Sequence, residues 1–195
     1  MEKYLIHVYK RGTIPFRSLS ALSDADAIDL MRANYIKGSV FWERFEDPAA
    51  YLQLRKQVED WLRREFIAKG GRPRADFPIY MAWGRSKWMD TMLDATTLAT
   101  TIEIQVPLSV FGEHVMSFTY PDSMVSFLLN MEKNAEYYLP EYHGQVFTFA
   151  EMRAILEANG LPGYKWGTEL PGYMANYIEA QVWDHAPLLA YQQAN

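Results

Sequence analysis

The sequence predicts an α+β protein in which a mostly antiparallel sheet is packed by helices. Two hydrophobic patterns lead to this prediction. Residues 48–68 carry apolar side chains at three- and four-residue steps, as an amphipathic helix does, whereas residues 101–106 alternate apolar and polar side chains, as a half-buried strand does. Segments of both kinds recur along the 195 residues, which suit one domain, 1–195.

The N-terminal part of the chain predicts one strand and one helix. Residues 3–9 are typical of a strand with large side chains on both faces. A helix is expected over 24–35, because the hydroxyl of Ser23 can accept a hydrogen bond from an unpaired N–H of the first turn. Gly38 lies just past its end, where glycine is common.

The helix over 48–68 is the best specified element. Asp47 can cap it, and Pro48 suits the first helical position because the N–H it lacks would be unpaired there. The opposite, polar face is expected to pair Glu59 with Arg63 at a spacing of four residues. Its apolar face consists of Tyr51, Leu54, Val58, Trp61, Leu62 and Phe66.

Two further strands are predicted in the middle of the chain. Residues 79–83 read as a buried strand, and residues 114–120 form a second one that ends at a turn of Pro121 and Asp122. Since only a short connection links it to the strand at 101–106, we expect these two strands to pair antiparallel.

The C-terminal third, about 140–195, is expected to be largely helical. Thr148 and Glu151 have the spacing of a capping box for a helix that ends at Asn159. A final helix is predicted across 173–184, with Pro187 interrupting it.

Composition makes some classes of function less favoured and excludes others. A net charge of −5 disfavours nucleic acid as a partner, and the absence of cysteine removes disulfides and thiolate chemistry. No apolar run reaches the length of about 18 residues that a membrane-spanning helix needs, and the first residues lack the pattern of a signal peptide. The simplest location is the cytoplasm of a prokaryote such as a bacterium, or of a phage-infected cell.

Aromatic residues make up 15% of the chain. They suit a bulky core, an aromatic-lined cleft, or the interface of a homo-oligomer. The four histidines are far apart in sequence, which predicts no metal site.

The first candidate binding cluster covers residues 83–90. Arg85 lies between two tryptophans, directly after a predicted strand, and Trp88 offers an indole face. A cation beside an indole suits a nucleobase, a phosphate or a carboxylate. The alternative is a strand-to-helix turn with the indoles packed inward.

The second candidate cluster covers residues 117–124. Tyr120, Asp122 and Ser123 combine hydroxyls with a carboxylate at the end of a strand, where they can bind a ribose or position a water. The alternative is a plain turn in which Asp122 bonds its own backbone. Arg17 adds a cation in the loop before the first helix.

The order of these elements resembles that of ADP-ribosyltransferase-like domains. The segments that carry the resemblance are SDADAIDLMRAN, EIQVPLSVF and SFTYPDS. The chain also resembles an uncharacterised bacterial family in the segments LRKQVEDWLRREFIAKGGRP, PIYMAWGRSKW and SFTYPDSM. The resemblance to ADP-ribosyltransferase-like domains implies NAD as a substrate and catalytic roles for Tyr80 and Glu103. Members of that superfamily also carry a histidine or arginine on the first strand, and His7 or Arg17 would match it.

These observations leave three hypotheses of function. The first is a nucleotide-binding, transferase-like domain in which Arg17 and Arg85 hold phosphate, Trp88 stacks on a ring, and Tyr80 or Tyr120 orients the ribose. The second is a non-catalytic module for protein–protein interaction or homo-oligomerisation. The third is an enzyme of different chemistry that uses Asp122 as an acid or base.

Overall fold

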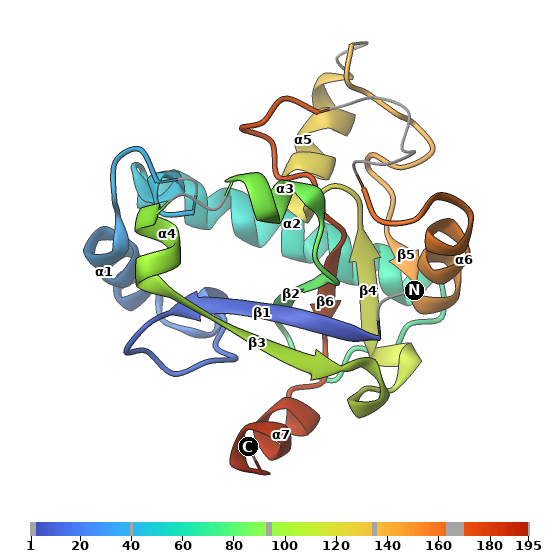
Figure 1. Ribbon diagram of the computed structural model, residues 1–195, viewed down its shortest axis with the longest axis horizontal. Helices are drawn as coiled ribbons and strands as arrows, with labels where there is room; N and C mark the ends of the chain where they lie inside the picture. Colours follow the sequence, from blue (N-terminus) through green and yellow to red (C-terminus); the bar gives the residue numbers. More distant parts are fainter. Residues whose placement is uncertain (1–2, 40, 93–94, 134–135, 163–169, 195) are drawn as a thin grey trace.

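The computed structural model describes residues 3–39, 41–92, 95–133, 136–162 and 170–194, and confirms the α+β fold (Figure 1). One six-stranded sheet runs through the molecule, in the order β3-β1-β2-β6-β4-β5, and all neighbouring strands are antiparallel. Its strands are β1 (Tyr4–Lys10), β2 (Ile79–Trp83), β3 (Thr101–Pro107), β4 (Met116–Thr119), β5 (Phe147–Thr148) and β6 (Glu179–Val182).

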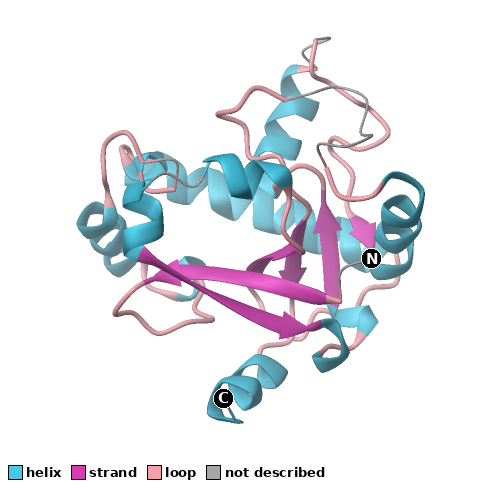
Figure 2. Cartoon of the chain, viewed as in Figure 1, coloured by secondary structure: helices cyan, strands magenta, loops and turns pink. Residues whose placement is uncertain are grey.

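The helices surround this sheet (Figure 2). Figure 1 shows the longest helix, α2, running across the molecule, with α7 and the C-terminus below β3. The described helices are α1 (Asp24–Asn34), α2 (Pro48–Ala68), α3 (Lys87–Met92), α4 (Ala95–Thr100), α5 (Ser123–Glu132), α6 (Phe149–Asn159) and α7 (Ala186–Ala194), with short 3-10 turns η1 (Leu19–Ala21), η2 (Glu43–Phe45), η3 (Leu108–Val110) and η4 (Glu113–Val115). None of these helices is long and apolar enough to cross a membrane.

The caps expected for three helices are confirmed. The hydroxyl of Ser23 accepts a hydrogen bond from the backbone N–H of Asp26, and Asp47 accepts one from Ala50 at 3.0 Å. Thr148 and Glu151 form the capping box of α6. Because local side-chain contacts of this kind satisfy N–H groups that the helix itself leaves unpaired, sequence alone identifies these starts.

The two faces of the sheet differ in chemistry. One face is apolar and packs against α6; its buried side chains include Leu5, Met81, Trp83, Phe118 and Val182. The other face is covered by α2 and α5 and carries polar side chains on three adjacent strands, namely Tyr80, Ser117, Thr119, Glu179 and Gln181. The register brings these polar residues side by side.

The expected pairing of the strands at 101–106 and 114–120 is wrong. β3 pairs with β1 at one edge, whereas β4 pairs with β5 and β6, so three strands separate them. The connection contains the 3-10 turns η3 and η4. It leads from the edge strand β3 to β4, with three strands between them, and therefore does not form a hairpin. The strand accordingly begins at Met116 rather than at residue 114.

The helix predicted across 173–184 is also wrong, because Glu179–Val182 form the central strand β6. Glu, Ala and Gln favour helix in isolation, but pairing with β2 on one side and β4 on the other overrides that preference. Pro187 lies in the first turn of α7, which begins at Ala186, rather than interrupting a helix, since proline is tolerated in a first turn. The C-terminal region thus supplies two strands, β5 and β6, as well as α6 and α7.

Helix α2 is held by a hydrophobic cluster of its own. Trp61 is only 8% exposed, and its ring lies 5.4 Å from that of Phe127 of α5. Val58, Leu62 and Phe66 are buried in the same cluster, together with Trp183. The cluster fixes α2 over the polar face of the sheet.

We therefore expect Trp61→Ala to lower the free energy of unfolding by about 3–5 kcal/mol, because it leaves a cavity the size of an indole. Ile67→Ala is the matched control: Ile67 lies on the same helix but is 49% exposed, so its loss should cost less than about 1 kcal/mol. Urea denaturation measures both. Equal losses in the two variants would contradict the packing of α2 described above.

Candidate functional site

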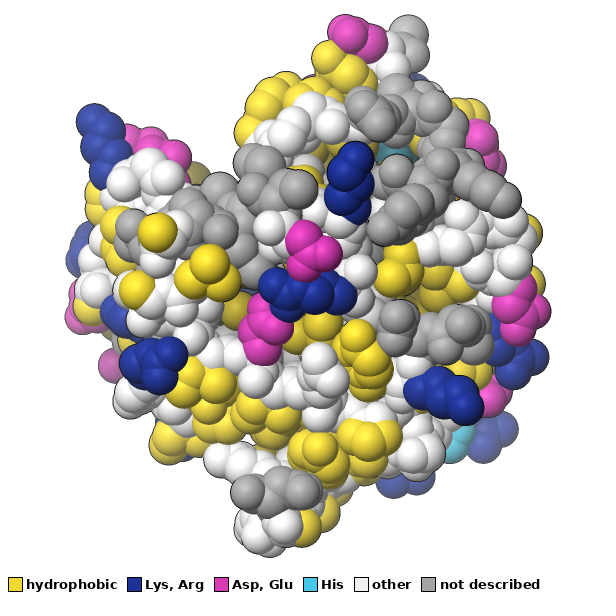
Figure 3. Space-filling view, in the orientation of Figure 1, with side chains coloured by type: hydrophobic (Ala, Val, Ile, Leu, Met, Phe, Trp, Pro, Cys, Tyr) yellow, Lys and Arg dark blue, Asp and Glu magenta, His cyan; other side chains and the backbone are white. Residues whose placement is uncertain are grey.

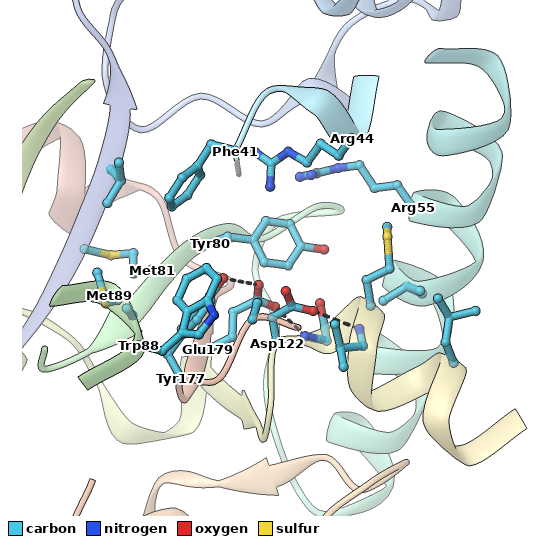
Figure 4. Close-up of a pocket in the computed structure, with 18 of the residues that line it drawn as sticks. Phe41, Arg44, Arg55, Tyr80, Met81, Trp88, Met89, Asp122, Tyr177 and Glu179 are labelled. Carbon is cyan, nitrogen blue, oxygen red and sulfur yellow. Dashed lines mark hydrogen bonds between the residues drawn. The ribbon is translucent and has the colours of Figure 1, made fainter. Parts of the chain in front are cut away.

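A cavity of about 370 Å³ lies between helices α2 and α5 and the polar face of the sheet. That volume is in the range of small-molecule pockets. Figure 4 shows Arg44 and Arg55 along one side of Tyr80, with Asp122 and Glu179 along the other. The pocket therefore has a cationic side and an acidic side. Its aromatic walls are formed by Phe41, Tyr51, Tyr80, Trp88, Tyr173 and Tyr177.

Arg55 is the buried cation of the pocket. Its side chain is 12% exposed. Nε lies 3.0 Å from Glu59 Oε1, with which Arg55 forms an ion pair, and it donates a hydrogen bond to the hydroxyl of Ser20 at 2.9 Å. The guanidinium lies 4.5 Å from the centre of the Tyr80 ring, as a cation–π pair does. Burial lowers the pKa of Arg55, but Tyr80, Tyr51 and Glu59 outweigh it, so that the pKa lies above its ordinary value.

Glu59 lies on the buried side of α2, not on the solvent face expected from the sequence. It is 3% exposed and pairs with Arg55 one turn earlier, whereas Arg63 donates to the carbonyl of Ala75. The hydroxyl of Tyr80 donates to Glu59 Oε1 at 3.1 Å. Among the described residues Oε2 has no hydrogen-bond partner. The tertiary position of α2, not the spacing of charges along it, decides the pairing.

Arg44 is the exposed cation of the pocket. It follows Phe41 in the chain, and its guanidinium lies 5.1–5.9 Å from the ring centres of Phe41, Phe45 and Tyr51. Within the described part of the chain it forms no ion pair. A positive charge held by aromatic rings and turned into a cavity is available to an anionic group of a ligand.

The acidic side is built where β4 ends and α5 begins. Asp122 caps α5 by accepting a hydrogen bond from the N–H of Val125 at 2.8 Å, and it is partly exposed to the pocket. Glu179 is 6% exposed and accepts hydrogen bonds from the N–H of Ser123 at 3.2 Å and the hydroxyl of Tyr177 at 3.3 Å. Both carboxyl groups thus face donors of the protein itself.

The two carboxyl groups hold protons more tightly than usual. Burial, followed by the charge of Glu179, raises the pKa of Asp122 to about 7. Burial also raises the pKa of Glu179 above its ordinary value. Two close carboxylates in a poorly hydrated place repel each other, so the pair is partly protonated near neutral pH.

A buried network behind the pocket fixes the position of Glu179. The side-chain amide of Gln181 donates to Glu179 Oε1 at 3.0 Å and to the hydroxyl of Thr119 at 3.1 Å, and its carbonyl accepts from Ser117 at 2.9 Å. The indole N–H of Trp183 donates to Ser117 at 2.8 Å. Because buried polar groups are costly unless paired, this network holds the carboxylate in one place.

Trp88 closes the pocket on its aromatic side. Its indole N–H donates to the carbonyl of Gly172 at 2.9 Å, and its ring stacks on Tyr177 with centres 5.8 Å apart. Phe41 is tilted against it, with a centre-to-centre distance of 6.5 Å. These three rings form an apolar wall of the cavity, against which a planar group of a ligand can pack.

The structure brings four of the predicted site residues into this pocket. Trp88 comes from the first candidate cluster, Asp122 and Ser123 come from the second, and Tyr80 comes from strand β2. The two clusters therefore meet in space, although about thirty residues separate them in the sequence.

Arg85 does not contribute to the pocket. Its guanidinium donates to Asp90 and, at 2.6 and 2.8 Å, to the two oxygens of Glu103 on the edge strand β3. Neither Arg85 nor Glu103 lines the cavity. The ion pairs of Arg85 with Asp90 and Glu103 hold the arginine at the surface. A catalytic role of Glu103 in this pocket is therefore not supported by its position.

Tyr120 and Arg17 also lie outside the pocket. Tyr120 is fully buried in the apolar cluster on the other face of the sheet, edge-on to Tyr142. Arg17 is exposed and does not line the cavity. His7 is buried as well: it accepts the N–H of Phe16 at 3.0 Å, and burial lowers its pKa to about 4, which is typical of a neutral structural histidine.

Sequence reasoning missed Arg44, Arg55 and Glu179. The sequence does contain one signal, since Arg55 and Glu59 are four residues apart on a well-predicted helix. Glu179 was hidden in a segment mistaken for helix. No spacing in the chain indicates that Arg44 lies near either residue.

No family model, curated protein or solved structure matches this chain. In the described ranges, no group of three or more His, Cys, Asp or Glu side chains is placed to hold a metal ion. The assignment of function rests on the pocket itself.

The raised pKa of Asp122 predicts how stability depends on pH. The folded state binds this proton more tightly than the unfolded chain, so the contribution of Asp122 to stability is present below about pH 4 and is lost as the pH rises to about 7. Asp122→Asn removes this loss and keeps a good helix cap. Its unfolding free energy should exceed that of the parent by about 1–2 kcal/mol at about pH 8, less than full linkage because the residue is partly exposed and coupled.

Urea denaturation at several pH values measures this difference. Comparing variant with parent cancels the titration of other groups, such as His7. A difference that stays constant between about pH 4 and about pH 8 would contradict the raised pKa.

Proposed function

We propose that the pocket binds a nucleotide or a closely similar planar anion. The observation that carries this proposal is the combination, in one cavity, of an arginine without an ion pair among the described residues, aromatic walls and a pair of hydrogen-bonded carboxyl groups. Few ligands present an anion, a flat ring and hydrogen-bond donors together. Nucleotides do.

Each side of the pocket suits one part of such a ligand. The phosphate lies against Arg44, with the charge of Arg55 behind it, since guanidinium groups match phosphate oxygens in geometry and charge. The base packs along Phe41 and Trp88. The remaining donors of the ligand face Asp122 and Glu179. The cavity suits a mononucleotide or one half of a dinucleotide.

The resemblance to ADP-ribosyltransferase-like domains adds NAD as a candidate substrate. In that case one half of NAD occupies the cavity, and the catalytic candidates are the groups that line it, Tyr80 and Asp122. Glu103, which the resemblance also suggests, is paired with Arg85 away from the cavity. We propose the binding of a nucleotide first, with transfer chemistry as an extension of it.

The rival hypothesis, an assembly module, has less support. It requires a contiguous apolar surface. The large hydrophobic side chains exposed in the described part of the chain belong to separate elements, and Figure 3 shows hydrophobic side chains scattered among charged and polar ones on the visible face. These exposed residues are Ile14, Leu30, Ile67, Leu98, Met131, Tyr173 and Leu189.

Arg44→Ala tests the proposal. AMP and NAD, each at millimolar concentration, should raise the melting temperature of the parent protein, because a ligand that binds only the folded state stabilises it. Arg44→Ala should abolish this rise while leaving the melting temperature without ligand nearly unchanged, since Arg44 is exposed. Differential scanning fluorimetry measures both quantities.

Arg85→Ala is the matched control, because it removes an arginine that is paired with surface carboxylates outside the pocket. It should keep the ligand-induced rise. If neither nucleotide shifts the parent protein, or if both variants lose the shift equally, nucleotide binding at this pocket is wrong.

A further inference from the structure

We infer that the Asp122–Glu179 pair recognises two adjacent hydrogen-bond donors of the ligand and releases a proton when they bind. This inference rests on the proposed nucleotide function and specifies which part of the nucleotide the acidic side of the pocket selects.

The positions of the two carboxyl groups give them different roles. Glu179 is almost fully buried, and its two oxygens already accept hydrogen bonds from Ser123, Gln181 and Tyr177. Asp122 caps α5 through Oδ1 and is partly exposed to the cavity. Asp122 is therefore the group that reaches the ligand, and Glu179 is the fixed charge behind it.

The charged and titratable groups around the pair act on its proton in opposite senses. Arg44 of η2 favours ionisation of Asp122, and Arg55 of α2 favours ionisation of Glu179. Burial of both carboxyl groups, joined for Asp122 by the charge of Glu179, acts in the opposite sense and is stronger. The phenols that face Glu179, Tyr80 of β2 and Tyr177, have pKa values well above their ordinary value and stay neutral.

A ligand changes this balance only if it stabilises the ionised form. Two adjacent donors, both directed at a carboxylate, favour the charged state over the protonated one. The pair then loses its proton to solvent on binding, and affinity rises with pH through about 7. A hydrogen-bond acceptor at this position would have the opposite effect.

Two parts of a nucleotide offer adjacent donors. One is the 2′,3′-diol of ribose, and the other is the N1–H and N2–H edge of guanine. Both present two adjacent donors to Asp122, but a different change in the nucleotide removes the donors in each case. Loss of the 2′-hydroxyl removes the first, whereas adenine in place of guanine removes the second.

Isothermal titration calorimetry with AMP, 2′-deoxy-AMP, GMP and 2′-deoxy-GMP distinguishes the two. If the diol is read, both deoxy compounds should bind about tenfold more weakly than their ribose counterparts. If guanine is read, GMP and 2′-deoxy-GMP should bind alike and about tenfold more tightly than AMP. In either case, titrations in buffers of different ionisation enthalpy should show proton release at about pH 7.

Asp122→Asn should weaken binding of the preferred nucleotide about tenfold and remove the proton release. Asp47→Asn is the matched control, since Asp47 caps α2 in the same way but lies outside the pocket. It should bind like the parent. Asp122→Ser, which also keeps a helix cap, repeats the test if the Asn variant does not fold.

The outcomes separate the inference from the proposal beneath it. Equal binding of all four nucleotides without proton release overturns the inference and leaves nucleotide binding intact, as does unchanged binding by both Asp122 variants. Absence of binding by all four overturns both. Proton release that the parent protein shows and Asp122→Asn lacks supports the inference when it accompanies either pattern of preference, because the phosphate of the nucleotide can itself release a proton on binding to an arginine.

Discussion

The pocket depends on one buried ion pair, between Arg55 and Glu59 of helix α2. These side chains connect three parts of the fold: Arg55 donates to Ser20 of η1, its guanidinium covers the ring of Tyr80 on β2, and Tyr80 donates to Glu59. A buried charge is tolerated only when it is paired and hydrogen-bonded, so each group requires the others. The pair thereby fixes the distance between α2 and the sheet, where the cavity lies.

The polar face of the sheet follows from the same constraint. A helix that carries an ion pair on its buried side cannot pack against a wholly apolar surface, and the three strands beneath it provide hydroxyls, an amide and a carboxylate instead. Ser117 of β4 donates a hydrogen bond to Gln181 of β6, and Gln181 donates one to Glu179, which holds this carboxylate at the edge of the cavity. Apolar packing of α2, centred on Trp61 and Phe66, offsets the cost of burying these polar groups.

Local signals explain which parts of the molecule were predictable from the sequence. α2 and α6 have caps and periodic apolar faces, which act within a few residues, and both were predicted correctly. β6 was not, because Glu179, Ala180 and Gln181 are of helix-favouring type and become a strand only through partners on both sides. The same holds for the candidate site. Trp88 and Asp122 belong to clusters that are visible in the sequence, whereas only the fold brings Arg44 near them.

A double-mutant cycle on Arg55 and Glu59 tests the central role of the ion pair most directly. Arg55→Met and Glu59→Leu should each lower the free energy of unfolding by about 3–5 kcal/mol, because each leaves a buried charge without its partner. The double variant should lose at least about 2 kcal/mol less than the sum of the two, since the remaining charge is gone. Single losses below about 0.5 kcal/mol that simply add would contradict a pocket organised around this pair.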